Sequence, residues 1–238
     1  KNIFINIKAT LEKLGLNFNN YFNENSLYES GAIENVVKSL KSKNLVYIKD
    51  GATWFKGSSV GCKQDRVIIK SSGEPTYRLP DIAYHLNKFS RNYELMVDVL
   101  GADHMDAYPD VLSAIQQLDC DIDKMKVVIH QFVTLTQDGE PVKMSTRKAQ
   151  FITLDELIQE VGKDVVRYFF IMRGNNSHLN FDMTIAKDES DENPVYYLQY
   201  AYARLSNILK HAESQEIKIN KKIDLSYLKL QSELSLIK

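Results

Sequence analysis

The sequence predicts an α/β domain with a largely parallel sheet, followed by the start of an all-helical domain. Up to about residue 185, short apolar stretches typical of strands alternate with segments of helical periodicity, which is the order of an α/β layer. From Asn193-Pro194 onward the pattern is helical only. With 238 residues, the chain can bury one large core or two small ones. We expect the first domain over residues 1–190 and the second over residues 191–238.

Local patterns in the first ninety residues predict two helices, two hairpins and a third helix. Apolar residues recur at helical spacing from residue 3 until Gly15, and again after Ser30. Asp50-Gly51 lies between two strand-like stretches and predicts a tight hairpin turn. Residues 66–79 have the pattern of a second hairpin, and residues 80–89 have that of a helix.

The next segment has the alternation expected of a parallel sheet. Residues 94–100 are almost wholly apolar, as expected for a buried parallel strand, and they run directly into Gly101. A helix is expected around 107–118. An apolar stretch follows at 127–135, and then a turn at Asp138-Gly139.

The last third is predicted to be mostly helical. Thr153 and Glu156 form a capping box in sequence that opens a helix, and a second helical stretch covers 163–173. After Asn193-Pro194, apolar residues return at alternating steps of four and three, which predicts a packing face. This face comprises Leu198, Tyr202, Leu205, Leu209 and Ala212.

Composition excludes several classes of protein. The 30 Lys and Arg balance 31 Asp and Glu, so the overall charge neither indicates nor excludes a nucleic-acid partner. The apolar runs are too short for a membrane span, and no signal peptide is expected. Cys62 and Cys120 have no partners at metal-ligand spacing, so we expect no metal site and read them as reduced thiols of a cytoplasmic protein. Because the sequence starts without Met inside a helical pattern, we expect a fragment of a longer protein.

The first group of residues with possible chemistry is Lys-Met-Ser-Thr-Arg-Lys at 143–148, after the Asp-Gly turn. Lysines on a loop beside a nucleotide can neutralise phosphate charge that develops in a transition state. From composition alone, a solvated basic turn is the more common explanation.

The second group is Leu-Gly-Ala-Asp-His at 100–104, where a predicted strand ends. Ligands of parallel α/β sheets bind at the carboxyl ends of strands, and Gly101 would let a ligand approach the backbone. Asp103 and His104 would then face that crevice. The alternative is a turn that caps the next helix.

The third group is Tyr77 and Asp81, which lie four residues apart where a helix is predicted to begin. On one helix face, a phenol and a carboxylate could grip a cation, and a carboxylate matches a guanidinium. The alternative is that Asp81 only stabilises the helix dipole. No serine-hydrolase elbow, P-loop or zinc-protease motif is present.

Taken together, these segments resemble the arginyl-tRNA synthetase family of class I synthetases. KMSTR at 143–147 is similar to the signature loop of the class, and SLYESGAIENVV (26–37), DRVIIKSSGEPTYRLPDIAYH (65–85), LGADH (100–104), DGEPVKMSTRKA (138–149) and DENPVYYLQYAYARLSNIL (191–209) follow in the family's order. The similarity covers about residues 1–212. It implies the second half of a Rossmann-like class I catalytic domain and the start of a helical anticodon-binding domain.

The resemblance implies an arginine–tRNA ligase, which uses ATP with Mg²⁺ to form arginyl-adenylate and transfers arginine to tRNA(Arg). Lys143, Met144 and Ser145 match the catalytic loop, and Tyr77 and Asp81 match positions around the arginine guanidinium. Gly101, Asp103, His104, Phe132 and Val133 would lie near ATP. A cytoplasmic, monomeric enzyme with no membrane partner is expected.

The sequence departs from the family in three places. Thr146 replaces the second lysine of the class I loop, and Ala149 stands where a glycine is common. No His-x-Gly-His segment occurs in these 238 residues, so we expect the chain to be inactive alone. A non-catalytic relative that binds RNA or another partner, and a class I synthetase for another amino acid, are the alternatives.

Overall fold

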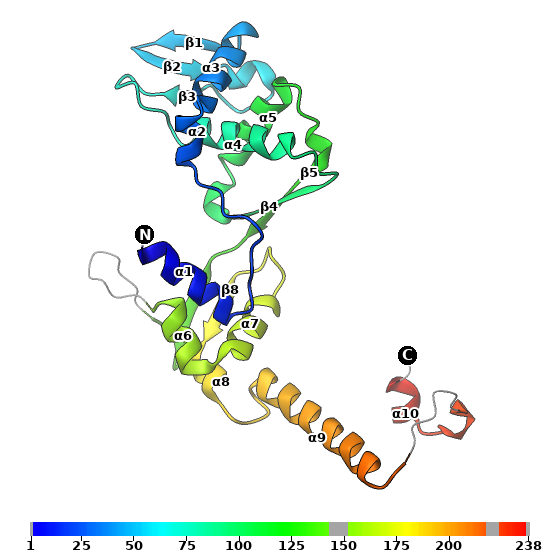
Figure 1. Ribbon diagram of the computed structural model, residues 1–238. Helices are drawn as coiled ribbons and strands as arrows, with labels where there is room; N and C mark the ends of the chain where they lie inside the picture. The colour runs from blue at the N-terminus through cyan, green and yellow to red at the C-terminus, as the bar shows by residue number, and fades with distance from the viewer. Residues whose placement is uncertain (1, 143–151, 218–223, 237–238) are drawn as a thin grey trace. The chain divides into compact units, whose positions relative to one another are not determined.

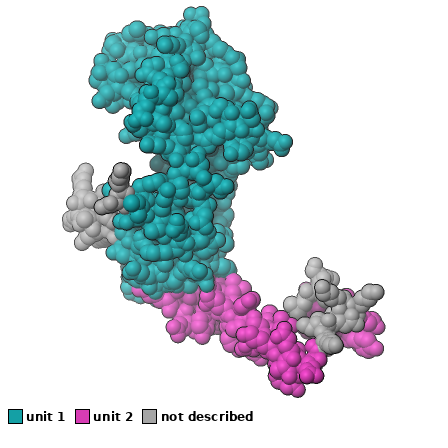
Figure 2. Space-filling view, viewed as in Figure 1, with its two compact units in different colours: residues 1–184 teal, residues 185–238 magenta. Residues whose placement is uncertain are grey.

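The chain folds into two compact units, residues 1–184 and residues 185–238 (Figure 2). The computed structural model describes residues 2–142, 152–217 and 224–236.

Helices and strands alternate over most of the first unit, as the sequence predicts (Figure 1). The helices are α1 (Asn2–Lys13), α2 (Asn25–Glu29), α3 (Ala32–Ser42), α4 (Arg78–Ser90), α5 (Tyr108–Gln117), α6 (Leu154–Val161), α7 (Lys163–Ile171), α8 (Met183–Lys187), α9 (Pro194–Ser214) and α10 (Gln231–Leu236). The strands are β1 (Val46–Lys49), β2 (Ala52–Phe55), β3 (Arg66–Ile69), β4 (Met96–Gly101), β5 (Met125–His130), β6 (Val133–Gln137), β7 (Glu140–Pro141) and β8 (Leu179–Asp182). Short 3₁₀ turns occupy Gly57–Val60, Ala102–His104, Ile122–Lys124 and Leu225–Tyr227.

Strands β1, β2 and β3 form an antiparallel sheet, and the predicted turn between β1 and β2 is confirmed. Asp50 and Gly51 both have positive φ (52° and 74°), which the tight hairpin turn requires. The second predicted hairpin, over residues 66–79, is confirmed at its turn: the Lys70 N–H donates to the Glu74 carbonyl at 2.8 Å, the Thr76 N–H donates to the Ile68 carbonyl at 2.9 Å, and Ile69 bridges Pro75 between these bonds. Its second arm is short because the chain enters α4 at Arg78.

The main hydrophobic core of the first unit lies among α2 to α5 and the strands β1 to β3. Helix α3 buries the four residues that its periodicity predicts: Ile33, Val36, Val37 and Leu40. They pack in one cluster with Leu79 and Ile82 of α4 and with Ala114 and Ile115 of α5. This packing fixes α4, the helix that carries Tyr77 at its N-cap and Asp81 in its first turn.

Two parallel strand pairs, β4–β5 and β6–β8, confirm the predicted α/β character. The expectation that residues 94–100 are buried is wrong for one face of β4. Val97 and Val99 are 51% and 68% exposed, while Asp98 and Leu100 line a cavity together with residues of α4 and α5. In the described part of the chain, the helices cover only this second face of the β4–β5 pair.

Helix α1 is joined to segments about 150 residues further along the chain. Asp155 of α6 accepts hydrogen bonds from Thr10 and from Lys13, the latter at 2.6 Å, and Arg167 of α7 donates to the Leu14 carbonyl. The predicted capping box at the start of α6 is confirmed, since the Glu156 N–H donates to the Thr153 hydroxyl and the Glu156 carboxylate accepts from the Thr153 N–H. These contacts hold the N-terminal helix on the pair α6–α7.

The second unit contains the long helix α9, whose start is confirmed. The Asn193 side chain accepts a hydrogen bond from the Val195 N–H at 3.0 Å and caps the helix. The predicted packing face of α9 is not covered within the described residues, because Leu198, Tyr202 and Leu205 are 51–75% exposed. Among the described helices, none is long and apolar enough to cross a membrane.

A buried carboxylate joins three elements at the beginning of α4. The Asp110 side chain, 5% exposed, accepts hydrogen bonds from the Nε atoms of Arg66 on β3 and Arg78 on α4, at 2.8 and 3.0 Å. A buried carboxylate with two guanidinium partners is a stable arrangement only while all the charges are present.

Asp110→Ala is expected to lower the free energy of unfolding by about 3–5 kcal/mol, because it leaves two partly buried guanidinium groups without their anion. Urea denaturation measures this. The matched change Asp106→Ala removes a carboxylate that is 87% exposed and lies 3.9 Å from Lys63, so its effect should stay within about 0.5 kcal/mol. Equal losses in both variants would contradict the role assigned to Asp110.

Candidate active site

The candidate site lies where β4 ends and α4 begins. Strands β4 and β5 run parallel and in register, so Gly101 and His130 mark the same edge of the pair. Ligands of parallel α/β sheets bind at this edge. The first turn of α4 reaches the same region, since Asp81 and His104 both line a small cavity beside β4.

Asp81 is a partly buried carboxylate without a hydrogen-bonding partner for its side chain among the described residues. Burial raises the pKa of the Asp81 carboxyl, and the nearby positive charges of His85, His104 and Lys88 offset this only in part. A partly buried carboxylate without a hydrogen-bonding partner is available to bind a cation. It lies in the first turn of α4, so it also has the favourable position relative to the helix dipole that the alternative interpretation required.

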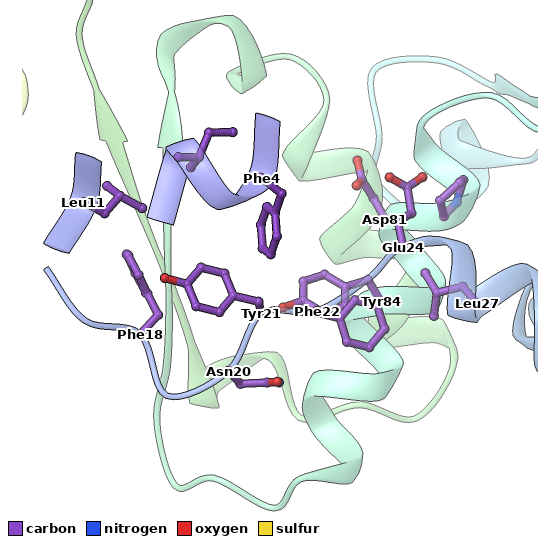
Figure 3. Close-up of a pocket in the computed structure, with 12 residues that line it drawn as sticks. Phe4, Leu11, Phe18, Asn20, Tyr21, Phe22, Glu24, Leu27, Asp81 and Tyr84 are labelled. Carbon is purple, nitrogen blue, oxygen red and sulfur yellow. The ribbon is translucent and has the colours of Figure 1, made fainter. Parts of the chain in front are cut away.

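The larger of the two cavities that Asp81 lines has a volume of about 510 Å³, and five of its twelve lining residues are aromatic (Figure 3). Figure 3 shows the carboxyl groups of Glu24 and Asp81 at the same end of this cavity. Its aromatic lining residues are Phe4, Phe18, Tyr21, Phe22 and Tyr84. Aromatic faces attract cations, and here the ammonium of Lys8 lies 4.1 Å from the centroid of the Tyr21 ring. Rings with two carboxylates at one end suit a cationic ligand of moderate size.

Tyr77 lies one turn before Asp81, at the N-cap position of α4, as the sequence predicts. Its side chain is 92% exposed, whereas Asp81 faces the cavity. The structure therefore places the two predicted cation ligands on consecutive turns, with the carboxylate sheltered and the phenol in solvent.

A second carboxylate, Asp98 of β4, contacts His85 and Lys88 of α4. Its oxygens lie 2.8 Å from His85 Nε2 and 2.5 and 2.7 Å from Lys88 Nζ. Burial acts to raise the pKa of Asp98, but the hydrogen bonds from His85 and Lys88 outweigh it and hold the pKa below its usual value. Asp98 is thus fully paired, while Asp81, a short distance away on α4, is not.

Gly101, Asp103 and His104 form the turn that leaves β4. A Cβ on residue 101 would lie 2.5 Å from the Asp103 carboxylate, so a larger residue there would require the exposed Asp103 side chain to move. Asp103 and His104 are 65% and 49% exposed and lie 3.8 Å apart. The alternative that this turn caps α5 is wrong, because the N-cap of that helix is Ala107 and no side chain caps it.

Phe132 lies between strands β5 and β6, and Val133 is the first residue of β6. The apolar stretch 127–135 does not form one strand, because β5 ends at His130 and β6 begins at Val133. Phe132, between them, is 60% exposed. The predicted Asp138-Gly139 turn after β6 is confirmed, with φ of 52° and 80°. The predicted catalytic residues Lys143, Met144 and Ser145 lie outside the described residues.

The sequence analysis missed the residues that support Asp81, namely Asp98, His85 and Lys88, and also Glu24. One signal was available, since an aspartate inside an otherwise apolar strand needs a partner. No such signal marks the cavity, because its wall combines the segment 4–24 with α4.

Comparison with known proteins gives the family. The model for the catalytic domain of the class I tRNA synthetases of the arginine type ("tRNA synthetases class I (R), catalytic domain") matches residues 2–179. The chain is 55% identical over 217 residues to an arginine–tRNA ligase of Desulfotalea psychrophila, covering 91% of this chain and 39% of that protein. It is 50% identical over 236 residues to an arginine–tRNA ligase of Salinibacter ruber, covering 99% of this chain and 42% of that protein.

Solved structures agree with this match. A structure described as an arginyl-tRNA synthetase from Campylobacter jejuni superposes with a TM-score of 0.85 at 33% identity, over 99% of this chain and 51% of that one. The Thermus thermophilus arginyl-tRNA synthetase, at 17% identity and a TM-score of 0.72, shares the fold over 95% of this chain and 47% of its own.

The match and the parallel strand pairs identify a class I synthetase catalytic domain. Within that class, the chain belongs to the arginyl-tRNA synthetase family. It spans about two fifths of the length of the two relatives named above.

The two aspartates of the site predict opposite effects on stability. Asp98→Asn should lower the free energy of unfolding at pH 7 by about 1.5–3 kcal/mol, because charge-assisted hydrogen bonds are lost. Asp81→Asn should leave it unchanged or raise it, because the charged form of Asp81 is disfavoured by burial.

The pH dependence separates the two effects in urea denaturation. The pKa of Asp98 is lowered on folding, so its contribution is present above the ordinary value near 3.8 and is lost as the pH falls through the lower folded value. The pKa of Asp81 is raised on folding. Its contribution to the stability of the folded state is therefore fully present below 3.8 and is lost as the pH rises through the pKa of the folded state. Destabilisation by Asp81→Asn at pH 7 as large as that by Asp98→Asn would be inconsistent with this account.

Proposed function

We propose that this chain is the second part of the catalytic domain of an arginine–tRNA ligase, with residues 191–238 beginning its helical anticodon-binding domain. The ligase joins the carboxylate of L-arginine to the α-phosphate of ATP and releases pyrophosphate. It then passes the arginyl group to the 3′-terminal adenosine of tRNA(Arg), releasing AMP. We further propose a monomeric, cytoplasmic enzyme without a membrane partner.

The observation that carries this proposal is the unpartnered, partly buried carboxylate of Asp81 in an aromatic cavity with a second carboxylate. A guanidinium offers two parallel N–H donors to a carboxylate and a flat face to aromatic rings. A lysine ammonium offers neither geometry, and a neutral side chain would leave Asp81 buried and unpaired. Asp81 would therefore select arginine, and Tyr77 would cover the guanidinium from the preceding turn.

The strand edge would hold the adenosine side of the reaction. Gly101 allows close approach to the backbone, and Asp103 and His104 offer exposed polar groups beside it. Phe132 and Val133 lie after the end of the neighbouring strand β5, where an adenine would contact apolar groups and the main chain. Lys143, Met144 and Ser145 would stabilise the departing pyrophosphate.

Mg²⁺ would arrive with ATP as part of the substrate. An Mg²⁺ ion of this kind binds mainly through phosphate oxygens and water. No step of the proposal needs a resident metal.

ATP–pyrophosphate exchange by the full-length protein, with tRNA present and each amino acid supplied separately, tests the proposed function. We expect exchange with arginine alone, and none from the 238-residue chain by itself. Exchange with a different amino acid would keep the class I reaction and reject the role of Asp81. No exchange from folded full-length protein with intact tRNA would favour a non-catalytic relative.

Asp81→Asn in the full-length protein is expected to raise the KM for arginine about tenfold or more, since a charge-assisted hydrogen bond contributes about 1.5–3 kcal/mol. The KM for ATP should change little. Steady-state exchange kinetics measure both, and Asp106→Asn, on an exposed turn, is the matched control. An unchanged arginine KM would remove Asp81 from the binding site.

A further inference from the structure

His85 connects the two aspartates of the site. On one side, its Nδ1 lies 2.7 Å from the main-chain carbonyl oxygen of Asp81, one turn earlier in α4. On the other side, its Nε2 lies 2.8 Å from the Asp98 carboxylate on β4. The side chain is 14% exposed, so water cannot easily replace either contact.

Both ring nitrogens of His85 face hydrogen-bond acceptors, which determines the form of the ring. A carbonyl oxygen and a carboxylate oxygen can only accept, so each nitrogen must carry a hydrogen and donate it. The ammonium of Lys88, 3.3 Å from Nε2, can only donate, and its partners are the two oxygens of Asp98. The ring of His85 thus lies between two acceptors, the Asp81 carbonyl and the Asp98 carboxylate.

The charges around Asp81 come from several elements. Helix α4 contributes His85 and Lys88, strand β4 contributes Asp98, and the turn after β4 contributes His104. Glu24 lines the large cavity together with Asp81, and Tyr108 lines the small cavity together with it. Of the groups that affect Asp81, His85 supplies the largest favourable charge, and it also bonds to the main chain of the same residue.

We infer that His85 is a positioning residue for arginine recognition: it ties the first turn of α4 to Asp98 and holds Asp81 in place as a carboxylate facing the cavity. This inference rests on the proposed function. Of the two cavities that Asp81 lines, His85 lines only the smaller one, so its ring does not line the cavity that holds the aromatic rings. It acts through Asp81, by a hydrogen bond to its carbonyl and by its charge.

A purely structural role for His85 makes a different prediction. In that case the important contact is the bridge from α4 to β4 through Asp98, and any effect on arginine would follow the loss of stability. A positioning role depends instead on the contact with Asp81. Two conservative variants separate these contacts, because they place an amide donor at one nitrogen position or the other.

His85→Asn places its amide nitrogen near the position of Nδ1, so it keeps the hydrogen bond to the Asp81 carbonyl and loses the one to the Asp98 carboxylate. His85→Gln places its amide nitrogen near the position of Nε2, so it keeps the hydrogen bond to Asp98 and loses the one to the Asp81 carbonyl. Both variants remove the positive charge. His178→Gln, on a histidine whose Nε2 meets only the exposed Thr134 hydroxyl at 2.8 Å, is the matched control.

The experiment measures arginine-dependent ATP–pyrophosphate exchange of the full-length protein between pH 5 and 8, together with urea denaturation of each variant. We expect His85→Gln to raise the KM for arginine about tenfold, the equivalent of one hydrogen bond. His85→Asn should raise it less although it destabilises the protein more. In both variants the acid limb of kcat/KM for arginine should move to higher pH, because Asp81 has lost a positive neighbour.

Either of two results would overturn the inference. One is that the variant with the larger loss of stability also has the larger KM for arginine, and the other is that the acid limb of kcat/KM for arginine does not move in either variant. Failure of the proposed function is recognised separately, because the wild-type protein and the His178→Gln control would then show no arginine-dependent exchange.

Discussion

The carboxylate of Asp98 is the contact on which the site depends. It lies on a strand, it binds two cations of one helix, and it thereby fixes the orientation of α4 against β4. Because Asp98 binds His85 and Lys88, Asp81, one helical turn before His85, has no side-chain hydrogen-bonding partner among the residues that the structure describes. The same helix thus carries a satisfied carboxylate contact that stabilises the fold and an unsatisfied carboxylate that is available to a ligand.

This division explains how a partly buried charge can serve recognition. Keeping Asp81 ionised in a sheltered position disfavours the folded state, and an incoming guanidinium relieves that cost with paired hydrogen bonds. An uncharged competitor cannot do so, and an ammonium does so with poorer geometry. Under the proposed function, selectivity for arginine would follow from a cost that the free protein already carries, and the aromatic residues of the cavity would add favourable contact with the flat cation.

The parts of the fold that depend on neighbouring residues could be predicted from the sequence. The Asp50-Gly51 turn, the buried face of α3 and the Thr153 capping box follow from local spacing, and the structure has them as predicted. Features that depend on contacts between distant segments could not be predicted from the sequence. The second hairpin has its turn but only a short second arm, because α4 begins at Arg78, and the exposed face of β4 could not be known without its neighbours. The predicted role of Tyr77 and Asp81 as ligands came from a family resemblance, while Asp98, which contacts His85 of α4, lies on a strand that no local pattern joins to that helix.

The most direct test of the central claim compares L-arginine with L-citrulline, in which a neutral ureido group replaces the guanidinium. Competition against arginine in the exchange reaction of the full-length protein gives the preference of the wild type and of Asp81→Asn. If Asp81 reads the charge of the ligand, the wild type prefers arginine strongly and the variant loses most of that preference, chiefly by weaker arginine binding. An undiminished preference in the variant would show that the charge of arginine is recognised elsewhere.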